Sequence, residues 1–259
     1  MADPVLGAAT VFVLCLTLSA LAFYRKVLTW DGTVAAFAVG LLIGIFGDVL
    51  WLVLLLFFLL SSFAATKYRF ALKEAMGVQE GLKGERRAAN VLANGIAPVA
   101  VAVLSWLYPA AFPKSLAGLV FVSTLAVAGA DTLASEIGVL SKRTYNIVTA
   151  RRVRTGSDGG VSWLGQGAAL GASLYTALFG WLVLYLAAGP LDLVRSMPTD
   201  PNLLLIPVAV GFAGCQIDSV LGATLETKRL LTKKSVNLVS TVLGGVLAYG
   251  LLLLIGGRS

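Results

Sequence analysis

The sequence contains no histidine, only two cysteines and little charge, since 13% of its 259 residues are Asp, Glu, Lys or Arg. Without histidine, imidazole metal sites and histidine-based acid–base catalysis are excluded. Cys15 and Cys215 lie in apolar runs without motif spacing, so we interpret them as reduced packing residues. Hydrophobic residues make up 58% of the chain, which leaves too little polar material for the surface of a water-soluble domain. The composition therefore predicts a polytopic membrane protein.

Apolar windows of roughly 17–25 residues predict an all-α helical bundle with seven or eight membrane spans, in a single integral membrane domain over residues 1–259. The second window is short and its break from the third, at Gly47-Asp48, is weak. A re-entrant unit is therefore the alternative for residues 33–66. The windows lie at about 5–24, 33–46, 48–66, 89–108, 115–140, 164–188, 203–226 and 236–256.

Lysine and arginine gather in alternate connections. All but three of the 20 lie at 25–26, 67–87, 142–154 and 228–234, and the exceptions are Lys114, Arg195 and Arg258. Because loops that stay in the cytoplasm carry an excess of these residues, we expect the four basic loops on the cytoplasmic side and both termini outside. The net charge of +7 is explained by the basic residues that keep these loops in the cytoplasm and attract them to anionic lipids. Binding of anionic ligands by the same loops is the further alternative.

Four carboxylates lie within the apolar runs or at their basic ends, namely Asp131, Glu136, Asp218 and Glu226. A carboxylate near the bilayer centre costs roughly 2.5–3.5 kcal/mol, so we expect these acids to act on a cation, a phosphate or a proton. The structural alternative is neutralisation by a buried Lys or Arg, but no basic residue lies in these spans at similar depth. Together with Ser135 and Ser219, the acids offer the oxygen ligands that Mg²⁺ prefers.

The chain also contains a weak internal sequence similarity between two segments. Asp131 and Asp218 each precede a basic pair by ten or eleven residues, and Asn90 and Asn237 each follow a basic pair. This similarity raises the hypothesis of an internal repeat that brings two acids and two asparagines together from four helices.

The loop at 149–162, with the sequence TARRVRTGSDGGVS, has features of a phosphate-binding segment. Arg152 and Arg154 offer bidentate contacts to phosphate, and Ser162 is placed to cap the next helix, whose N-terminus favours anions. The tight backbone is permitted by Gly156, Gly159 and Gly160. The loop lacks the Gly-Lys-Ser/Thr of a nucleotide-binding P-loop. A flexible basic loop followed by a capped helix explains the same composition equally well.

Two charged residues near the basic ends of the second and third spans have ordinary explanations. Asp31, in Trp30-Asp31-Gly32, is suited to be an N-cap, and Lys67 is suited to be a topology charge. Ligand binding is the alternative for each.

Several segments together resemble a known family. They are Trp-Asp-Gly at 30–32, Arg-x-x-x-Val-Leu-Ala-Asn-Gly at 87–95, Asp-Thr-Leu-Ala-Ser-Glu-Ile-Gly at 131–138, Gly-x-x-Gly-Gly-Val-Ser at 156–162, Asp-Ser-x-Leu-Gly-Ala at 218–223 and the Asn237 segment. They look like the signature of an integral membrane family that contains plant and cyanobacterial phytyl-phosphate kinase and the animal transmembrane protein nineteen group. The glycine loop departs from the expected Gly-Thr-x-Gly-Gly, because Thr155 precedes Gly156 and Ser157-Asp158 fills the gap.

The resemblance implies phosphoryl transfer from a nucleoside triphosphate, CTP or ATP, to an isoprenoid monophosphate such as phytyl phosphate. On this hypothesis Asp131, Glu136 and Asp218 hold Mg²⁺, and small residues on the fifth and seventh spans form a groove for the lipid tail. The expected catalytic residues are these three acids and Arg154, which together with Arg152 and the glycine loop also holds phosphates. The remaining expected binding residues are Asp31, Lys67, Arg87, Asn90, Asn94, Ser135, Ser162, Ser219, Glu226 and Asn237.

Two other functions remain open from the sequence. The segment at 218–229 distantly resembles CTP-using phosphatidate cytidylyltransferases, which makes nucleotidyl transfer to a lipid phosphate one alternative. An ion-coupled transporter is the other, because intramembrane carboxylates suit it too. The position of the acids towards the basic ends of their spans argues against a complete transport pathway. We expect the lipid bilayer and small ligands as partners, not nucleic acid, and the oligomeric state is left open.

Overall fold

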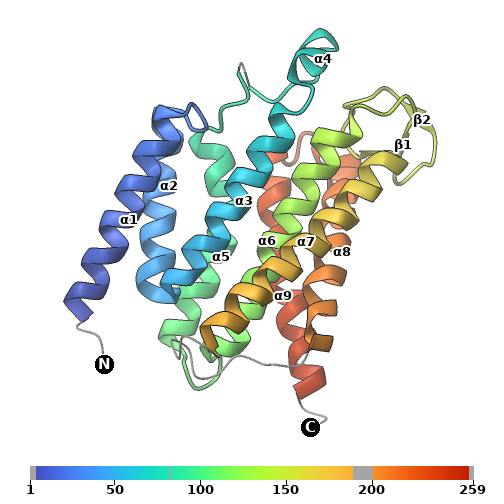
Figure 1. Ribbon diagram of the computed structural model, residues 1–259. Coiled ribbons are helices and arrows are strands. Elements are labelled where there is room, and N and C mark those ends of the chain that lie inside the picture. Colours follow the sequence, from blue (N-terminus) through green and yellow to red (C-terminus); the bar gives the residue numbers. More distant parts are fainter. Residues whose placement is uncertain (1–3, 82, 189–200, 257–259) are drawn as a thin grey trace.

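Eight helices of the computed structural model, which describes residues 4–81, 83–188 and 201–256, are long and apolar enough to cross a membrane. Figure 1 shows them as one bundle, with the two ends of the chain at the same end of it. The predicted polytopic helical architecture is thus confirmed. Arg195 and Arg258 lie outside the described residues. The long helices are α1 Pro4–Tyr24, α2 Trp30–Leu42, α3 Val49–Lys67, α5 Ala88–Leu107, α6 Lys114–Gly138, α7 Trp163–Ala188, α8 Leu205–Leu221 and α9 Lys233–Gly256.

The second and third windows form two separate spans. Helix α2 continues through a π-helical turn, Ile43–Gly47, and the chain then becomes extended at Asp48. The carboxylate of Asp48 caps α3 by accepting a hydrogen bond from the backbone N–H of Leu50 at 2.8 Å. The weak Gly47-Asp48 break therefore ends one helix and starts the next, and the re-entrant alternative is wrong.

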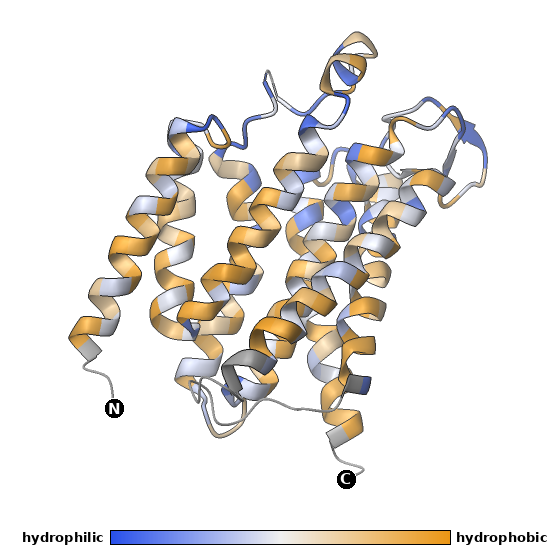
Figure 2. Ribbon diagram, in the orientation of Figure 1, coloured by the Kyte–Doolittle hydropathy of each residue, from blue (hydrophilic) through white to orange (hydrophobic). Residues whose placement is uncertain are grey.

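The basic end of the bundle carries structure that apolar windows do not reveal. A short helix, α4 Phe70–Ala75, follows α3, and three short strands lie between α6 and α7. The strands are β1 Thr144–Asn146, β2 Arg152–Val153 and β3 Gly160–Val161, and they form an antiparallel sheet in the order β2-β1-β3. This small sheet is an addition to the predicted helical bundle. Figure 1 shows α4 and the strands at the end opposite to both termini, and Figure 2 shows hydrophilic residues gathered there.

Helix α6 is the central helix of the bundle, and its residues from Ala117 to Ala130 are all buried. Small residues let neighbouring helices approach it closely. A Cβ atom added at Gly211 of α8 would meet Ala126 of α6 at 2.8 Å, and one at Gly214 would meet Val127 at 2.5 Å. This tight contact leaves no room for a lipid tail between α6 and α8 at these positions, and the tail groove expected along the fifth and seventh spans stays a prediction.

Candidate active site

Two carboxyl groups from different spans meet near the basic end of the bundle. The carboxyl groups of Asp131 on α6 and Asp218 on α8 border the same cavity and lie close enough to interact electrostatically. Helix α9 supports both acids. The amide Nδ2 of Asn237 donates to Asp131 Oδ2 at 3.0 Å, and the hydroxyl of Ser240 donates to Asp218 Oδ2 at 2.9 Å. The predicted proximity of the two acids is therefore confirmed.

This carboxyl pair has the chemistry of a cation site. Two carboxylates in contact cannot both stay ionised unless a proton or a cation lies between them. Mg²⁺ typically takes one or two protein carboxylates and completes its coordination with phosphate and water. Asp131 and Asp218 therefore fit a Mg²⁺ ion as its protein ligands.

A cavity of about 270 Å³ lies beside the carboxyl pair. Its wall includes Ser135 from α6 and Ser219 from α8, as well as Glu226, which lies in a π-helical turn, Gly222–Glu226, that extends α8. The ammonium-bearing side chain of Lys233, at the start of α9, is exposed and borders the same cavity. The cavity thus combines acidic, hydroxyl and basic groups at one end of the bundle.

The glycine loop closes another side of this cavity, which Gly156, Gly159 and Gly160 all border. Gly159 has a φ of +65° and packs directly on Ala223, where a Cβ atom would overlap the neighbouring residue. The loop is thus held by the small sheet against the end of α8. This placement brings the glycines of the loop to the cavity wall, and the phosphate-binding role of the loop stays a prediction.

Ser162 caps α7 as the sequence predicted. Its hydroxyl accepts a hydrogen bond from the N–H of Gly165 at 3.1 Å and donates to the carbonyl of Gly138 at 3.2 Å. Ser162 also borders the cavity, so the start of α7 and the end of α6 are joined at its wall. Because this hydroxyl already donates one hydrogen bond and accepts another, Ser162 positions the start of α7 at the cavity wall.

Residues 13–245 match the model of a family described as Integral membrane protein DUF92. The chain belongs to this family. Two relatives are uncharacterized membrane proteins, one from Synechocystis sp., 31% identical over 97% of this chain and 92% of its own, and one from Methanocaldococcus jannaschii, 29% identical over 84% of this chain and 82% of its own. Protein VTE6, chloroplastic, from Arabidopsis thaliana is 31% identical over 85% of this chain and 64% of its own. No solved structure matches the chain.

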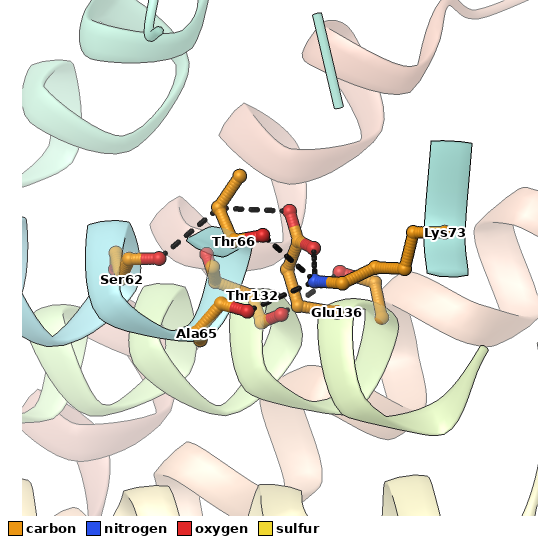
Figure 3. Close-up of polar contacts among 7 residues, drawn as sticks. Ser62, Ala65, Thr66, Lys73, Thr132 and Glu136 are labelled. Atoms are coloured by element: carbon orange, nitrogen blue, oxygen red, sulfur yellow. Dashed lines mark hydrogen bonds and ion pairs between the residues drawn. The ribbon is translucent and has the colours of Figure 1, made fainter. Parts of the chain in front are cut away.

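In this member of the family, Glu136 is neutralised by a buried lysine (Figure 3). Lys73 of α4 places its ammonium 2.6 Å from Glu136 Oε2 and also donates to the carbonyls of Ala65 and Thr66 at 2.9 Å each. The hydroxyl of Thr66 donates to Glu136 Oε1 at 2.8 Å. The structural alternative, neutralisation by a buried lysine, is therefore correct for Glu136. Lys73 was missed because it enters from a short helix outside the spans.

The expected three-carboxylate metal site is not formed. Both oxygens of Glu136 are occupied by Lys73 and Thr66, although the residue borders the cavity. Across the described ranges, no group of three or more Asp, Glu or Cys side chains lies close enough to hold a metal ion. The metal site that the geometry offers is the pair Asp131 and Asp218 alone.

The arginines of the loop lie away from the cavity wall. Arg152 and Arg154 are exposed, and Arg152 donates from Nη2 to the carbonyl of Lys142 at 3.3 Å. Neither borders the cavity. Their predicted roles at phosphate, including the catalytic role of Arg154, stay predictions.

Asp31, Lys67 and Arg87 form contacts at the basic end but do not border the cavity. Asp31 accepts from the N–H of Ala88 at 3.0 Å and lies 4.0 Å from Arg87 Nε, so it holds the start of α5. Thr29, not Asp31, caps α2. Lys67 donates to the carbonyl of Lys83, and its ammonium lies 5.3 Å from the ring centroids of two phenylalanines, Phe63 and Phe70. The N-cap role expected for Asp31 at α2 is therefore wrong, and the ligand-binding roles expected for Asp31, Lys67 and Arg87 stay predictions.

Glu80 is a charged residue of the cavity wall that the sequence did not reveal. It accepts hydrogen bonds from Asn90 Nδ2 at 2.7 Å and from Lys234 at 3.0 Å, and so joins the starts of α5 and α9. Burial opposes the ionisation of Glu80, but Lys234, Lys233 and the Asn90 amide outweigh it and lower the pKa of Glu80 to about 2. Asn90 therefore orients Glu80, while Asn237 orients Asp131.

Arg86 is a further residue that was missed, after Lys73 and Glu80. It is buried, and burial lowers the pKa of its guanidinium, whereas the charges of Glu136, Glu80 and Asp131 act in the opposite direction. The sequence offered the signal in the pair Arg86-Arg87, but the motif pointed to Arg87, which is exposed. Asn94 lies one turn below Asn90 and donates to its carbonyl at 3.2 Å, and its own buried Oδ1 has no hydrogen-bond partner among the described residues.

Proposed function

We propose that the protein transfers the terminal phosphoryl group of a nucleoside triphosphate, CTP or ATP, to an isoprenoid monophosphate such as phytyl phosphate, giving the diphosphate. The observation that carries this proposal is the placement of Asp131 and Asp218 together at the wall of a cavity that the glycine loop and Lys233 also border. The motifs shared with the family that contains phytyl-phosphate kinase support the same chemistry.

The reaction needs little from the protein beyond positioning and charge neutralisation. An oxygen of the lipid monophosphate attacks the terminal phosphorus of the nucleotide, and the bond from that phosphorus to the bridging oxygen breaks, so that a nucleoside diphosphate leaves. The attacking oxygen is already anionic, so no strong base is required. The absence of histidine from the sequence is compatible with this chemistry.

The cavity residues have roles that follow from their charge. Asp131 and Asp218 would hold Mg²⁺, which when bound neutralises phosphate oxygens and holds them in line for transfer. Lys233 adds positive charge from the start of α9, and Asn237 and Ser240 hold the two acids in place. The glycine loop closes the cavity around the nucleotide phosphates.

The acceptor is amphipathic, so the site must face a phosphate at the membrane surface while the tail stays in the bilayer. The cavity lies at the basic end of the bundle, where the lysine- and arginine-rich loops gather. We assign this end to the cytoplasmic side because of the positive-inside bias, which places the site where the nucleotide is available.

The deciding experiment incubates the purified protein with phytyl, geranylgeranyl or farnesyl phosphate and each nucleoside triphosphate in the presence of Mg²⁺, and resolves the products by mass. We expect a lipid diphosphate and a nucleoside diphosphate in equal amounts. Asp131→Asn should abolish turnover without loss of monodispersity. Asp48→Asn is the matched control, because asparagine also caps helices. Asp48 lies at the start of α3, at the end of the bundle away from the cavity. Full activity of Asp131→Asn would remove Asp131 from the mechanism.

The same products separate the alternatives. Release of pyrophosphate together with a nucleotide-linked lipid would mean nucleotidyl transfer by a cytidylyltransferase. Ion flux into proteoliposomes that needs no nucleotide would mean a transporter. Either result would replace the kinase proposal.

A further inference from the structure

One wall of the cavity beside the carboxyl pair is an irregular segment between α4 and α5. Residues 78–81, which we call the strap, border the cavity with every residue except Gly81. None of the four is fully buried, and among the described residues no backbone hydrogen bond joins 79–81 to another element. A segment with few buried contacts and few backbone hydrogen bonds opens at low cost in free energy. The strap is therefore the wall of the cavity that moves most easily.

Both flanks of the strap are fixed to the bundle. On the α4 side, the buried ammonium of Lys73 contacts Glu136 and two carbonyls at the end of α3 (Figure 3). On the α5 side, a Cβ atom added at Gly84 would meet the side chain of Thr66 at 3.1 Å. The backbone N–H of Arg86 donates to a carbonyl of the α1–α2 connection at 3.0 Å. The strap thus runs between two fixed points.

The chain is able to bend where the strap meets each flank. On the α4 side, the N–H of Val78 donates to the carbonyl of Lys73 at 3.0 Å, and this turn ends the hydrogen bonding of α4. On the α5 side, Gly81 has a φ of +63°, a region that glycine adopts without the steric penalty of other residues. Hinges of moving loops are a few residues of this kind that absorb changes in φ and ψ. The strap is therefore free to pivot while α4 and α5 keep their places.

Two contacts hold the strap across the cavity. Val78 packs on the glycine loop, since a Cβ atom added at Gly156 would lie 2.9 Å from Val78 Cγ1 and 3.6 Å from its Cβ. Glu80 accepts a hydrogen bond from Lys234, at the start of α9, at 3.0 Å. Val78, Glu80 and Lys234 are all half-buried. The strap thus reaches from the glycine loop to α9, and the described arrangement is the closed one.

The closed cavity is too small for the two substrates of the proposed reaction. Its volume is about 270 Å³, whereas a site for a single small molecule usually has about 300–1,000 Å³. A wall must therefore move before a nucleoside triphosphate and a lipid phosphate meet there. The other walls are helices of the bundle and the glycine loop, whose Gly159 packs directly on Ala223. The strap is the wall without such packing.

Gln79 gives a bound ligand a reason to favour the closed strap. Gln79 borders the cavity, and its buried side-chain oxygen Oε1 has no hydrogen-bond partner among the described residues. A buried acceptor without a partner is costly. A ligand that supplies a donor, such as a hydroxyl or amino group of a nucleoside, removes this cost when the strap is closed over it. A ligand that binds the closed form better shifts the equilibrium towards that form.

We infer that the strap is a lid, which opens to admit the nucleotide from the basic end of the bundle and closes over it, with the Glu80–Lys234 ion pair as its latch. The inference rests on the proposed function for the identity of the ligand and adds the route by which the ligand enters. Closure excludes water from the phosphates, so that the phosphoryl group passes to the lipid phosphate and not to water.

A disulfide across the contact between the strap and the glycine loop locks the lid. The 3.6 Å between Val78 Cβ and a Cβ atom at Gly156 suits a disulfide, which needs about 3.5–4.5 Å. Val78→Cys/Gly156→Cys is made in a Cys15→Ser/Cys215→Ser background, and the oxidised protein is compared with the same sample after reduction. We expect oxidation to lower turnover at least about tenfold and reduction to restore it, while the background protein responds to neither. Failure of the pair to cross-link, or full turnover of the locked protein, would overturn the inference.

The order of addition separates a closed lid from a distorted site. A radiolabelled, non-hydrolysable triphosphate analogue is added with Mg²⁺ either before or after oxidation of the cysteine pair, and the protein is then desalted. Analogue added first should stay with the protein until reduction, and analogue added afterwards should not bind. Equal retention in the two orders would contradict entry past the strap.

A labelling arm tests the lid without nucleotide. Ser219→Cys places a thiol at a half-buried position of the cavity wall in the same cysteine-free background, and its reaction with a charged methanethiosulfonate reagent is timed. Glu80→Gln weakens the latch and should raise the rate about tenfold. Glu74→Gln, on an exposed glutamate of α4, is the control and should change the rate less than about twofold. Equal rates in the two variants would show that Glu80 is no latch and would refute the lid.

The outcomes distinguish the two proposals. If the wild-type protein phosphorylates a lipid phosphate but the locked protein does so equally well, the lid inference fails and the kinase proposal stands. If the wild type phosphorylates no acceptor, the kinase proposal fails, and the labelling rates alone decide whether the strap opens.

Discussion

The side-chain amide of Asn237 donates a 3.0 Å hydrogen bond to Asp131, while its own Oδ1 is buried without a hydrogen-bond partner in the described structure. A donor behind a metal-binding carboxylate fixes the orientation of that carboxylate. The unpaired Oδ1 faces no competing protein donor, so it remains available as an acceptor. Asn237 is thus placed to position Asp131 rather than to react.

Asn237→Leu keeps the approximate volume of the side chain and removes the hydrogen bond to Asp131. We expect activity to fall about 10–100-fold and the Mg²⁺ concentration for half-maximal activity to rise, because Asp131 loses its orientation. A Mg²⁺ titration of the initial rate measures both effects. Asn94→Leu, which removes another buried amide that does not contact the acids, should leave the Mg²⁺ midpoint unchanged. An unaltered midpoint in Asn237→Leu would refute the positioning role.

The ion pair of Lys73 and Glu136 predicts a large effect on stability. Lys73→Met leaves the buried Glu136 carboxylate without its partner, which should lower the free energy of unfolding by about 3–5 kcal/mol. The double variant Lys73→Met/Glu136→Gln should recover part of this loss, because the uncompensated charge is gone. Thermal unfolding of the single and double variants in one detergent measures the coupling. Lys83→Met, on an exposed lysine, is the control. If the losses of stability caused by Lys73→Met and Glu136→Gln simply added in the double variant, the pairing of the two residues would be contradicted.

The parts of the fold that were predictable from sequence are those determined by local patterns. Apolar runs fix the eight spans, Asp48 marks a helix start, and Ser162 marks another. Asp131 and Asp218 were found because a carboxylate in an apolar run is costly wherever its partners lie.

Glu136 was misinterpreted for the opposite reason. Its partner Lys73 is 63 residues away in the sequence, and the partner of Glu80, Lys234, is 154 residues away. Both contacts involve the connection between α3 and α5, whose packing has no periodic signal. Strands of two or three residues are likewise too short to show an alternating pattern.

Glu80 predicts a pH dependence of stability. Its pKa in the folded protein is lowered to about 2 from an ordinary value of 4.5, so the ionised form stabilises the fold above pH 4.5, and this contribution is lost as the pH falls towards 2. Glu80→Gln lacks the contribution. The difference in unfolding free energy between wild type and variant should be at most about 3 kcal/mol near neutral pH and should shrink on acidification. Unfolding midpoints measured between pH 7 and 3 test this, and a pH-independent difference would contradict it.

The assignment of the basic end to the cytosol is tested by labelling from outside the cell. In a background with Cys15→Ser and Cys215→Ser, single cysteines are placed at exposed positions at opposite ends, as Ala110→Cys and Lys142→Cys. A membrane-impermeant maleimide should modify Ala110→Cys in intact cells and Lys142→Cys only after lysis. The reverse pattern would place the proposed kinase site on the wrong side for cytosolic nucleotide.

Gly159 tests whether the glycine loop shapes the cavity. In Gly159→Ala the new methyl group overlaps Ala223, so the loop must move away from the end of α8, in addition to the backbone strain of about 1–2 kcal/mol at a positive φ. We expect the KM for the nucleotide to rise about 10–100-fold, and trypsin to cleave faster at the arginines of 151–154. Gly77→Ala is the matched control, because Gly77 has a φ of +68°, also borders the cavity, and has no atom within 4 Å of the added Cβ. It carries the same strain without the overlap, so an equal rise in KM for both variants would attribute the effect to strain or to the cavity wall in general and not to the contact between the loop and α8.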